Sequence, residues 1–180
     1  MTDHEPAPPA RPSPPAQLAQ LAQLNVARMR ATLDDPLMAD FVALLDPVNA
    51  LAEASPGFVW RLVGEGESDA TSLRPFGPDW IVNLTVWADV EALWNFTYRT
   101  GHLDLVRRRR SWFHLPEEAH MVLWWVPAGH IPTVEEAAAR LGTLRAHGPT
   151  PEAFTFATRF PAPEATASPA APATAPTPSA

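Results

Sequence analysis

Cysteine and lysine are both absent from this sequence of 180 residues. Without cysteine the chain can form neither disulfides nor thiolate metal sites, and it has no cysteine nucleophile. All 13 basic residues are arginine, they face 20 acidic residues, and the formal net charge is -7. A general nucleic-acid binder needs a basic surface, so we expect no nucleic-acid partner.

Long apolar runs are lacking as well. No segment approaches the roughly 20 apolar residues that a membrane-spanning helix needs, and the first residues include acidic groups and no signal-like apolar segment. We therefore expect a cytoplasmic protein with no membrane partner. The motifs of zinc proteases, phosphate-binding loops and dinucleotide-binding domains are missing too, and no cluster of metal ligands is visible.

Proline is concentrated at the two ends of the chain. Residues 1–16 and 162–180 consist largely of proline, alanine, serine and threonine. Such segments bury too little apolar area to offset the entropy lost on ordering, so we predict that both are disordered. Residues 17–161 have ordinary globular composition and should form one domain.

Between the tails, hydrophobic periodicity and turn residues predict an ordered series of strands and helices. The first helix starts at Asp34-Asp35-Pro36, and Pro47 should kink or break it. A long helix is predicted from Val90 to about Phe113. The strands are expected at residues 18–30, 58–63, 80–87, 121–126 and 154–160, and the other helices at residues 34–54 and 133–146.

This order is β-α-β-β-α-β followed by an added α-β unit. The first six elements have the split pattern of ferredoxin-like α+β domains, whose helices cover one face of the sheet only. The other face must also be covered, and pairing with a second copy is a common solution. We therefore predict a homodimer of the dimeric α/β-barrel type.

The alternation along the first and third strands distinguishes two sheet faces. One face is uniformly apolar and should lie under the helices: Leu24, Val26, Val82, Leu84 and Val86. The opposite face mixes amides, a hydroxyl and an indole, which suits a ligand pocket. A wet surface or a polar dimer interface would explain it equally well. Its members are Gln23, Asn25, Asn83, Thr85 and Trp87.

The long helix supplies a second candidate region. Tyr98, His102 and Arg109 would lie along one edge of it, beside a buried stripe that includes Trp94. His102 could act as a general base or as an axial ligand of a metal or heme, and Tyr98 could contact an oxygenated substrate. The alternative is that His102 simply packs and hydrogen-bonds between helix and sheet. Arg109 should meet a carboxylate or a ligand anion.

His130 follows the strand that contains Trp124 and Trp125. A polar residue at a strand end beside two indoles could line a pocket, or it could be a turn residue that caps the following helix.

Three segments resemble a known family. QLNVARMR (residues 23–30), YRTGHLDLVRRRRSWF (98–113) and WWVPAGHIPTVEEAAARL (124–141), with GPTPEAFTF after it, are similar to a bacterial domain family of unknown function. That family is assigned to the dimeric α/β-barrel superfamily. The resemblance spans residues 18–156 and implies the fold and the dimer. Because one fold hosts many chemistries, it selects no reaction.

Two functional classes follow. The first is a small monooxygenase-like oxidoreductase, with or without heme, that acts on an apolar or aromatic organic molecule. The second is a non-catalytic module that binds such a molecule, and a cofactor-free lyase or isomerase lies between them. In the enzyme, His102 and Tyr98 would be catalytic. The substrate-binding residues would be Asn25, Asn83, Thr85, Trp87, Trp94, Arg109, Trp125 and His130.

Overall fold

The computed structural model describes residues 19–163, so the predicted disordered tails lie almost wholly outside it. Four strands form one antiparallel sheet in the order β2-β3-β1-β4. Their bounds are Ala19–Arg28 for β1, Phe58–Arg61 for β2, Trp80–Trp87 for β3 and Met121–Pro127 for β4.

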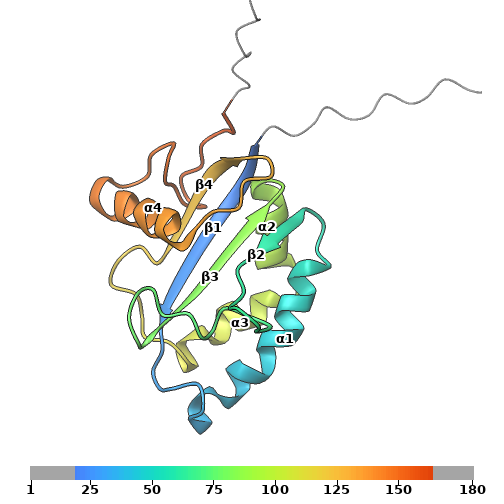
Figure 1. The fold of residues 1–180 in the computed structure, drawn as a ribbon, viewed down its shortest axis with the longest axis vertical. Coiled ribbons are helices and arrows are strands. Elements are labelled where there is room, and N and C mark those ends of the chain that lie inside the picture. The colour runs from blue at the N-terminus through green and yellow to red at the C-terminus, as the bar shows by residue number, and fades with distance from the viewer. Residues whose placement is uncertain (1–18, 164–180) are drawn as a thin grey trace, which may run out of the picture.

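The connections carry the helices (Figure 1). Between β1 and β2 lie a short 3-10 turn, η1, and α1. Between β3 and β4 lie α2, α3 and a second 3-10 turn, η2, and α4 follows β4. This order and the strand arrangement confirm the predicted ferredoxin-like α+β fold. The bounds are Pro36–Met38 for η1, Ala39–Glu53 for α1, Val90–Arg99 for α2, His102–Arg108 for α3, Arg109–Ser111 for η2 and Val134–His147 for α4.

Side-chain caps explain where several of these elements begin. Asp89 accepts the Ala92 N–H at 2.8 Å at the start of α2, and Thr133 accepts the Glu136 N–H at 3.1 Å at the start of α4. Such caps satisfy backbone donors that have no partner inside the helix. The predicted break at Pro47 is wrong, because α1 continues through it. Pro47 lies on the exposed side of α1, where water can satisfy the carbonyl left without its helical donor.

The predicted long helix from Val90 to Phe113 is also wrong, because it is broken at Thr100 and Gly101. Thr100 is extended, with φ -116° and ψ -177°. Its hydroxyl donates to the Phe96 carbonyl at 2.6 Å and accepts the His102 N–H at 3.2 Å. This side chain thus ends α2 and starts α3, so Tyr98 and His102 do not share a continuous helix.

The predicted strand over residues 154–160 is reduced to a single bridge between Phe154 and Leu123. Beyond it the chain turns, because the Thr158 N–H meets the Thr155 hydroxyl at 3.3 Å and the Thr158 carbonyl accepts the Thr155 N–H. A turn of this kind removes the backbone groups that a strand would offer to β4. The added C-terminal unit is therefore a helix with an irregular segment.

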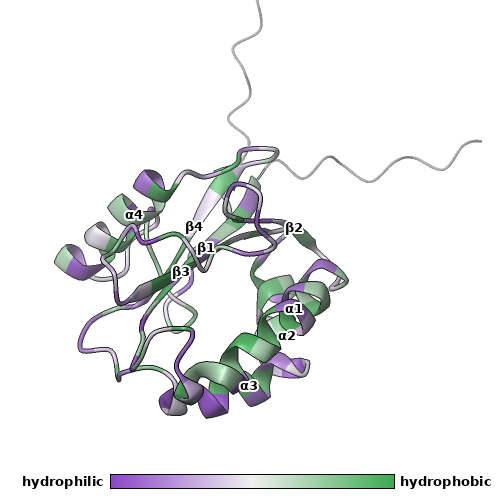
Figure 2. Cartoon of the chain, turned by 60° about the horizontal axis from the view of Figure 1, so that its bottom comes forward, coloured by the Kyte–Doolittle hydropathy of each residue, from purple (hydrophilic) through white to green (hydrophobic). Residues whose placement is uncertain are grey.

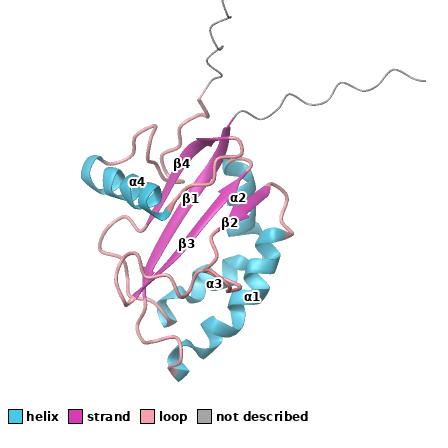
Figure 3. Cartoon of the chain, in the orientation of Figure 1, coloured by secondary structure: helices cyan, strands magenta, loops and turns pink. Residues whose placement is uncertain are grey.

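The apolar sheet face is covered by α4, not by the helices that precede β4. Leu141 and Leu144 of α4 and Ala70 of the long connection after β2 pack on this face, and Figures 1 and 3 show α4 and α2 on opposite sides of the strands. Trp124 donates its indole N–H to Glu136 of α4 at 2.9 Å. The sheet side chains in this core are Ala22, Leu24, Val26, Val82, Leu84, Val86, Val122, Trp124 and Val126.

The sequence analysis therefore predicted the wrong covering helices for each of the two sheet faces. The uniformly apolar face, expected under the ferredoxin helices, lies under α4 and the β2–β3 connection. The mixed face lies under α1, α2 and α3, and Figure 2 shows these three helices grouped away from α4. The mixed face, which was expected to pair with a second copy, is thus covered by helices of the same chain.

Helices α1 and α2 and the segment after η2 contact the mixed face at its two ends. At one end Leu21, Trp87 and Leu123 of the sheet pack with Leu93 and Phe96 of α2. At the other end Met29, Met38, Phe41 and Trp112 form a separate apolar cluster. The middle of this face is left without an apolar cover.

Shortening a side chain at the centre of α4 tests whether this helix stabilises the apolar face. Leu141→Ala should lower the free energy of unfolding by about 2–5 kcal/mol, because Leu141 is 1% exposed in this core and its loss leaves a cavity. Urea denaturation measures the change. Leu115→Ala is the matched control, since Leu115 is 61% exposed. Equal losses in the two variants would contradict the assignment.

Candidate functional site

The middle of the mixed face consists of two polar cross-strand pairs. Gln23 of β1 lies opposite Thr85 of β3, and Asn25 lies opposite Asn83. Apolar pairs flank them, with Leu21 opposite Trp87 on one side and Ala27 opposite Ile81 on the other. The apolar contacts of the covering helices on this face are with flanking residues such as Leu21, Trp87 and Ile81.

A cavity of about 720 Å³ lies over these polar pairs. Its floor is the middle of the sheet, and its walls come from α1, α2, α3, η2, the connection after β2 (residues 69–71) and the segment before β4 (residues 113–118 and 120). Among the apolar wall residues are Phe41, Leu44 and Leu45 of α1 and Leu93 and Phe96 of α2. Apolar walls around a few convergent polar groups are the usual composition of a small-molecule site.

One half of the floor is fixed by a buried chain of hydrogen bonds. The Trp87 indole N–H donates to the Thr85 hydroxyl at 2.9 Å, and that hydroxyl donates to the Gln23 carbonyl oxygen at 2.8 Å. Gln23 and Thr85 are 8% and 6% exposed. The chain holds the Gln23 amide in one orientation and leaves its nitrogen as the group that can donate to a ligand.

The other half of the floor is unsatisfied. Neither Asn25 nor Asn83 makes a side-chain hydrogen bond within residues 19–163, and Asn83 is exposed to the cavity. β2 ends at Arg61, and the following Leu62 N–H still donates to the Leu84 carbonyl at 2.8 Å, but β2 does not extend along β3 to Asn83. Two adjacent free amides provide both donors and acceptors for a bound molecule.

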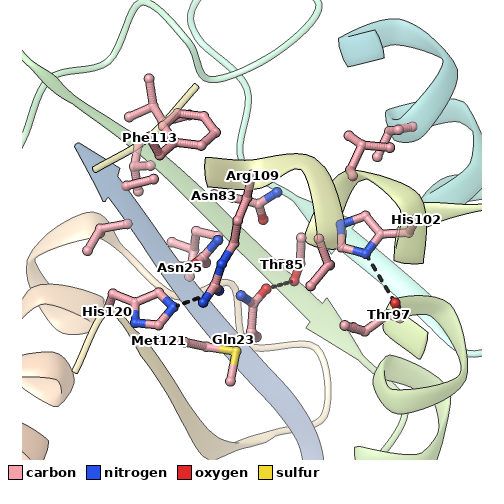
Figure 4. A pocket seen from close by; sticks show the side chains of 18 of the residues that line it. Gln23, Asn25, Asn83, Thr85, Thr97, His102, Arg109, Phe113, His120 and Met121 are labelled. Atoms are coloured by element: carbon pink, nitrogen blue, oxygen red, sulfur yellow. Dashed lines mark hydrogen bonds between the residues drawn. The ribbon is translucent and has the colours of Figure 1, made fainter. Parts of the chain in front are cut away.

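His102, the first residue of α3, lies in the wall of the cavity (Figure 4). Its Nδ1 lies 3.4 Å from the Thr97 carbonyl, and its ring packs on Phe96 with centroids 4.7 Å apart. If Nδ1 carries the proton, Nε2 is left as an acceptor with no partner in the described chain. Burial lowers the pKa of His102 from the ordinary 6.5, an effect that the bond to Thr97 opposes.

Arg109 and His120 form the opposite side of the site. Arg109 belongs to η2 and remains exposed, and its Nη1 lies 3.4 Å from Nε2 of His120, just before β4. Figure 4 shows the Arg109 side chain passing beside Asn25 to reach His120. Burial lowers the pKa of His120, the cations Arg109 and Arg145 lower it further, and a hydrogen bond to the Glu118 backbone opposes them. The ring is therefore a neutral acceptor for Arg109.

The structure brings together most of the residues selected from the sequence. The cavity lining includes Asn25, Asn83, Thr85, Trp87, Tyr98, His102 and Arg109. Tyr98 packs against Trp94 and Phe156, with ring centroids 4.3 Å and 5.9 Å away.

Three predicted ligand contacts lie outside this cavity. Trp94 packs on Tyr98 and under the Arg159 guanidinium. The Trp125 indole donates to the Phe160 carbonyl at 2.9 Å. His130 lies 2.7 Å from Glu136, next to the α4 cap. The position of His130 agrees with the alternative interpretation made from the sequence, a residue at the turn before the helix.

His120 was missed from the sequence, although it lines the cavity beside Arg109. No residue spacing links it to Arg109 or Asn25, because they meet only when β4 pairs with β1. The sequence offered one signal, because His120 comes immediately before the strand β4. In the structure Met121, the next residue, pairs with Asn25 of β1, so His120 lies near Asn25.

The cavity does not fit a heme. His102 has the anchored ring nitrogen that a ligating histidine needs. However, a porphyrin laid on the floor would cover the Asn25 and Asn83 amides with an apolar ring, which costs free energy, and Arg109 crosses the same space. Within residues 19–163 no group of three or more His, Asp or Glu side chains is arranged to hold a metal ion.

The structure is a ferredoxin-like α+β domain with a polar-floored cavity between sheet and helices. Comparison with known families matches residues 20–170 to a domain of unknown function, DUF3291. The chain belongs to this family, which confirms the predicted assignment to a domain family of unknown function. No curated protein is similar enough to match the chain.

Several solved structures are similar in arrangement. A protein of unknown function from Nitrosomonas europaea is 16% identical, with a TM-score of 0.42 over 66% of this chain and 99% of that chain. SnoaB, a cofactor-independent oxygenase from Streptomyces nogalater, is 18% identical, with a TM-score of 0.39 over 64% and 96%. A dabb family protein with a ferredoxin-like fold from Mesorhizobium loti is 12% identical, with a TM-score of 0.37 over 63% and 98%. At these values the likeness carries no argument about chemistry.

None of the helices in residues 19–163 combines the length and the apolar character needed to cross a bilayer.

The lowered histidine pKa values predict how stability depends on pH. His102 and His120 bind protons more weakly in the folded chain than in the unfolded chain, where the pKa is about 6.5. The unfolded state therefore gains protons first, and the free energy of unfolding should fall as pH drops from 7.5 to 5.5. Urea denaturation across this range measures the slope.

The double variant His102→Gln with His120→Gln should have a flatter slope than the wild-type chain. His147→Gln is the control, because His147 is exposed at the end of α4. An unchanged slope in the double variant would show that neither ring is held neutral by the fold.

Proposed function

We propose that the cavity binds an apolar or aromatic organic molecule with an oxygen function, and that His102 removes a proton from it. The observation that carries this proposal is the state of His102. One ring nitrogen is engaged by the Thr97 carbonyl, and the other has no partner and borders the cavity. A neutral, oriented imidazole is the usual form of a general base near neutral pH.

The other lining residues suit the remaining tasks. Phe41, Leu44 and Phe96 offer apolar contact for a ring system, and exclude water from part of the cavity. Asn25 and Asn83 can hydrogen-bond the oxygen of the substrate and stabilise negative charge that develops on it after proton removal. Tyr98 would contact the bound ring from α2.

Monooxygenation is the further step that we propose for this site. Removal of a proton from a CH₂ group beside a carbonyl leaves an electron-rich carbanion, which dioxygen can oxidise. In the balanced reaction, CH₂ and O₂ become C=O and H₂O, so one oxygen atom enters the substrate and the other leaves as water. The substrate supplies both electron pairs, and the reaction uses the protonated His102 as the source of the returning proton.

The alternatives differ in what His102 does. In a lyase or isomerase the proton would be moved without uptake of oxygen. In a non-catalytic binding module His102 would only border the ligand. The homodimer also stays a prediction, and its interface would lie away from the apolar sheet face, because α4 covers that face.

The 2-tetralone molecule is a suitable probe, since it is aromatic, has one carbonyl and carries acidic C–H groups. The protein should accelerate exchange of these hydrogens for deuterium, followed by NMR in D₂O. His102→Gln should slow the catalysed exchange by about 10²–10⁴-fold, the usual contribution of a general base. Dioxygen uptake measured in parallel tests the oxidation step.

His147→Gln is the matched control and should exchange hydrogens at the wild-type rate. Exchange without dioxygen uptake would identify an isomerase-like or lyase-like site. Exchange at equal rates in wild-type and His102→Gln protein would overturn the role of His102 and leave the binding module.

A further inference from the structure

Arg109 differs from Arg107 and Arg108, which precede it in the arginine run, in what it contacts. Arg107 lies 3.5 Å from Asp104, and Arg108 lies 2.6 Å from Asp40. Arg109 meets no carboxylate among residues 19–163, and its one recorded partner is the imidazole of His120 at 3.4 Å. A guanidinium has five N–H donors and a neutral imidazole nitrogen accepts one, so most donors of Arg109 remain available.

The groups around Arg109 add further N–H donors. Asn25 and Asn83, the adjacent free amides of the floor, lie on the same side of the sheet as Arg109 (Figure 4). Of the acidic side chains in the lining, Glu118 is paired with Arg145 at 3.2 Å, Asp69 accepts the Thr71 N–H at 2.7 Å, and Glu117 is exposed. Arg109 and the two amides therefore make this corner of the cavity rich in N–H donors.

From this geometry we infer that the molecule bound in the cavity is a carboxylate, held by Arg109 with hydrogen bonds from Asn25 and Asn83. The inference rests on the proposed function and specifies its substrate class: an aromatic or apolar carboxylic acid. The carboxylate replaces the missing acidic partner of Arg109. The apolar part of the molecule then extends between the sheet and α1–α3 toward His102.

A carboxylate suits this corner better than a phosphate group. Planar carboxylates accept two parallel N–H bonds from one guanidinium, and this fork adds geometric selectivity to the charge interaction. Arg28 and Arg110 also line the cavity without an ion pair within residues 19–163, but Arg109 is the guanidinium that passes beside Asn25. One guanidinium and two neutral amides match a single negative charge.

Isothermal titration with 2-naphthoate and with its neutral analogue 2-naphthalenemethanol tests this inference on the full chain. The wild-type protein should bind 2-naphthoate at least about tenfold more tightly than the alcohol. Arg109→Gln should remove most of that preference, since bonds to charged groups contribute strongly to affinity, and should leave the affinity for the alcohol within about twofold.

Arg107→Gln is the matched control, because Arg107 belongs to the same run and points to solvent beside Asp104. It should retain the preference for 2-naphthoate. Circular dichroism of each variant verifies that the fold is kept. An equal affinity for the two probes, no binding of either, or a preference that survives Arg109→Gln would overturn the inference.

The same titrations separate this inference from the proposed reaction. His102→Gln should retain the Arg109-dependent preference, because His102 lies on the opposite side of the site. A preference that persists while hydrogen exchange is absent would leave the carboxylate site in place and overturn the proposed function. Exchange that depends on His102 without any preference for 2-naphthoate would overturn the carboxylate inference alone.

Discussion

The alternation of side chains along β1 and β3 divides the sheet into two faces, and the packing of the other elements depends on this division. On one face the central positions are apolar, and α4 with the β2–β3 connection buries them. On the other face two polar pairs interrupt the apolar ones. Covering these pairs tightly would leave amides without partners. The helices therefore pack on the flanking apolar pairs, at the two ends of the face, and the middle remains hollow.

The break between α2 and α3 determines where His102 lies in the candidate site. A continuous helix would have set His102 one turn after Tyr98, whereas the Thr100 hydroxyl ends α2 and receives the first N–H of α3. The ring of His102 then packs against Phe96, and the Thr97 carbonyl engages one nitrogen. At the other side, pairing of β4 with β1 brings His120 to Arg109. An imidazole and a guanidinium thus border opposite sides of one cavity.

Local patterns in the sequence were sufficient for the order of the four strands, for α1 and α4, for the ferredoxin-like class and for the polar middle of one sheet face. Asn25, Asn83 and Thr85 could be recognised because strand periodicity is local and polar residues stand out against it. The sequence could not show which helices cover which face, since this depends on how α4 packs after β4. It also favoured a continuous helix through Thr100, because a threonine hydroxyl that replaces helical bonds leaves no distinct periodic signal. His120 was missed because its partners lie on other strands.

We propose that the polar middle of the sheet is the floor of a ligand site, and a crystal structure of the chain with 2-naphthoate would test this. We expect the naphthalene ring between the sheet and α1–α3, with its carboxylate on Arg109 and its far edge toward His102. Density for the ligand elsewhere on the molecule, or a cavity closed by the side chains of α1 and α3, would contradict it.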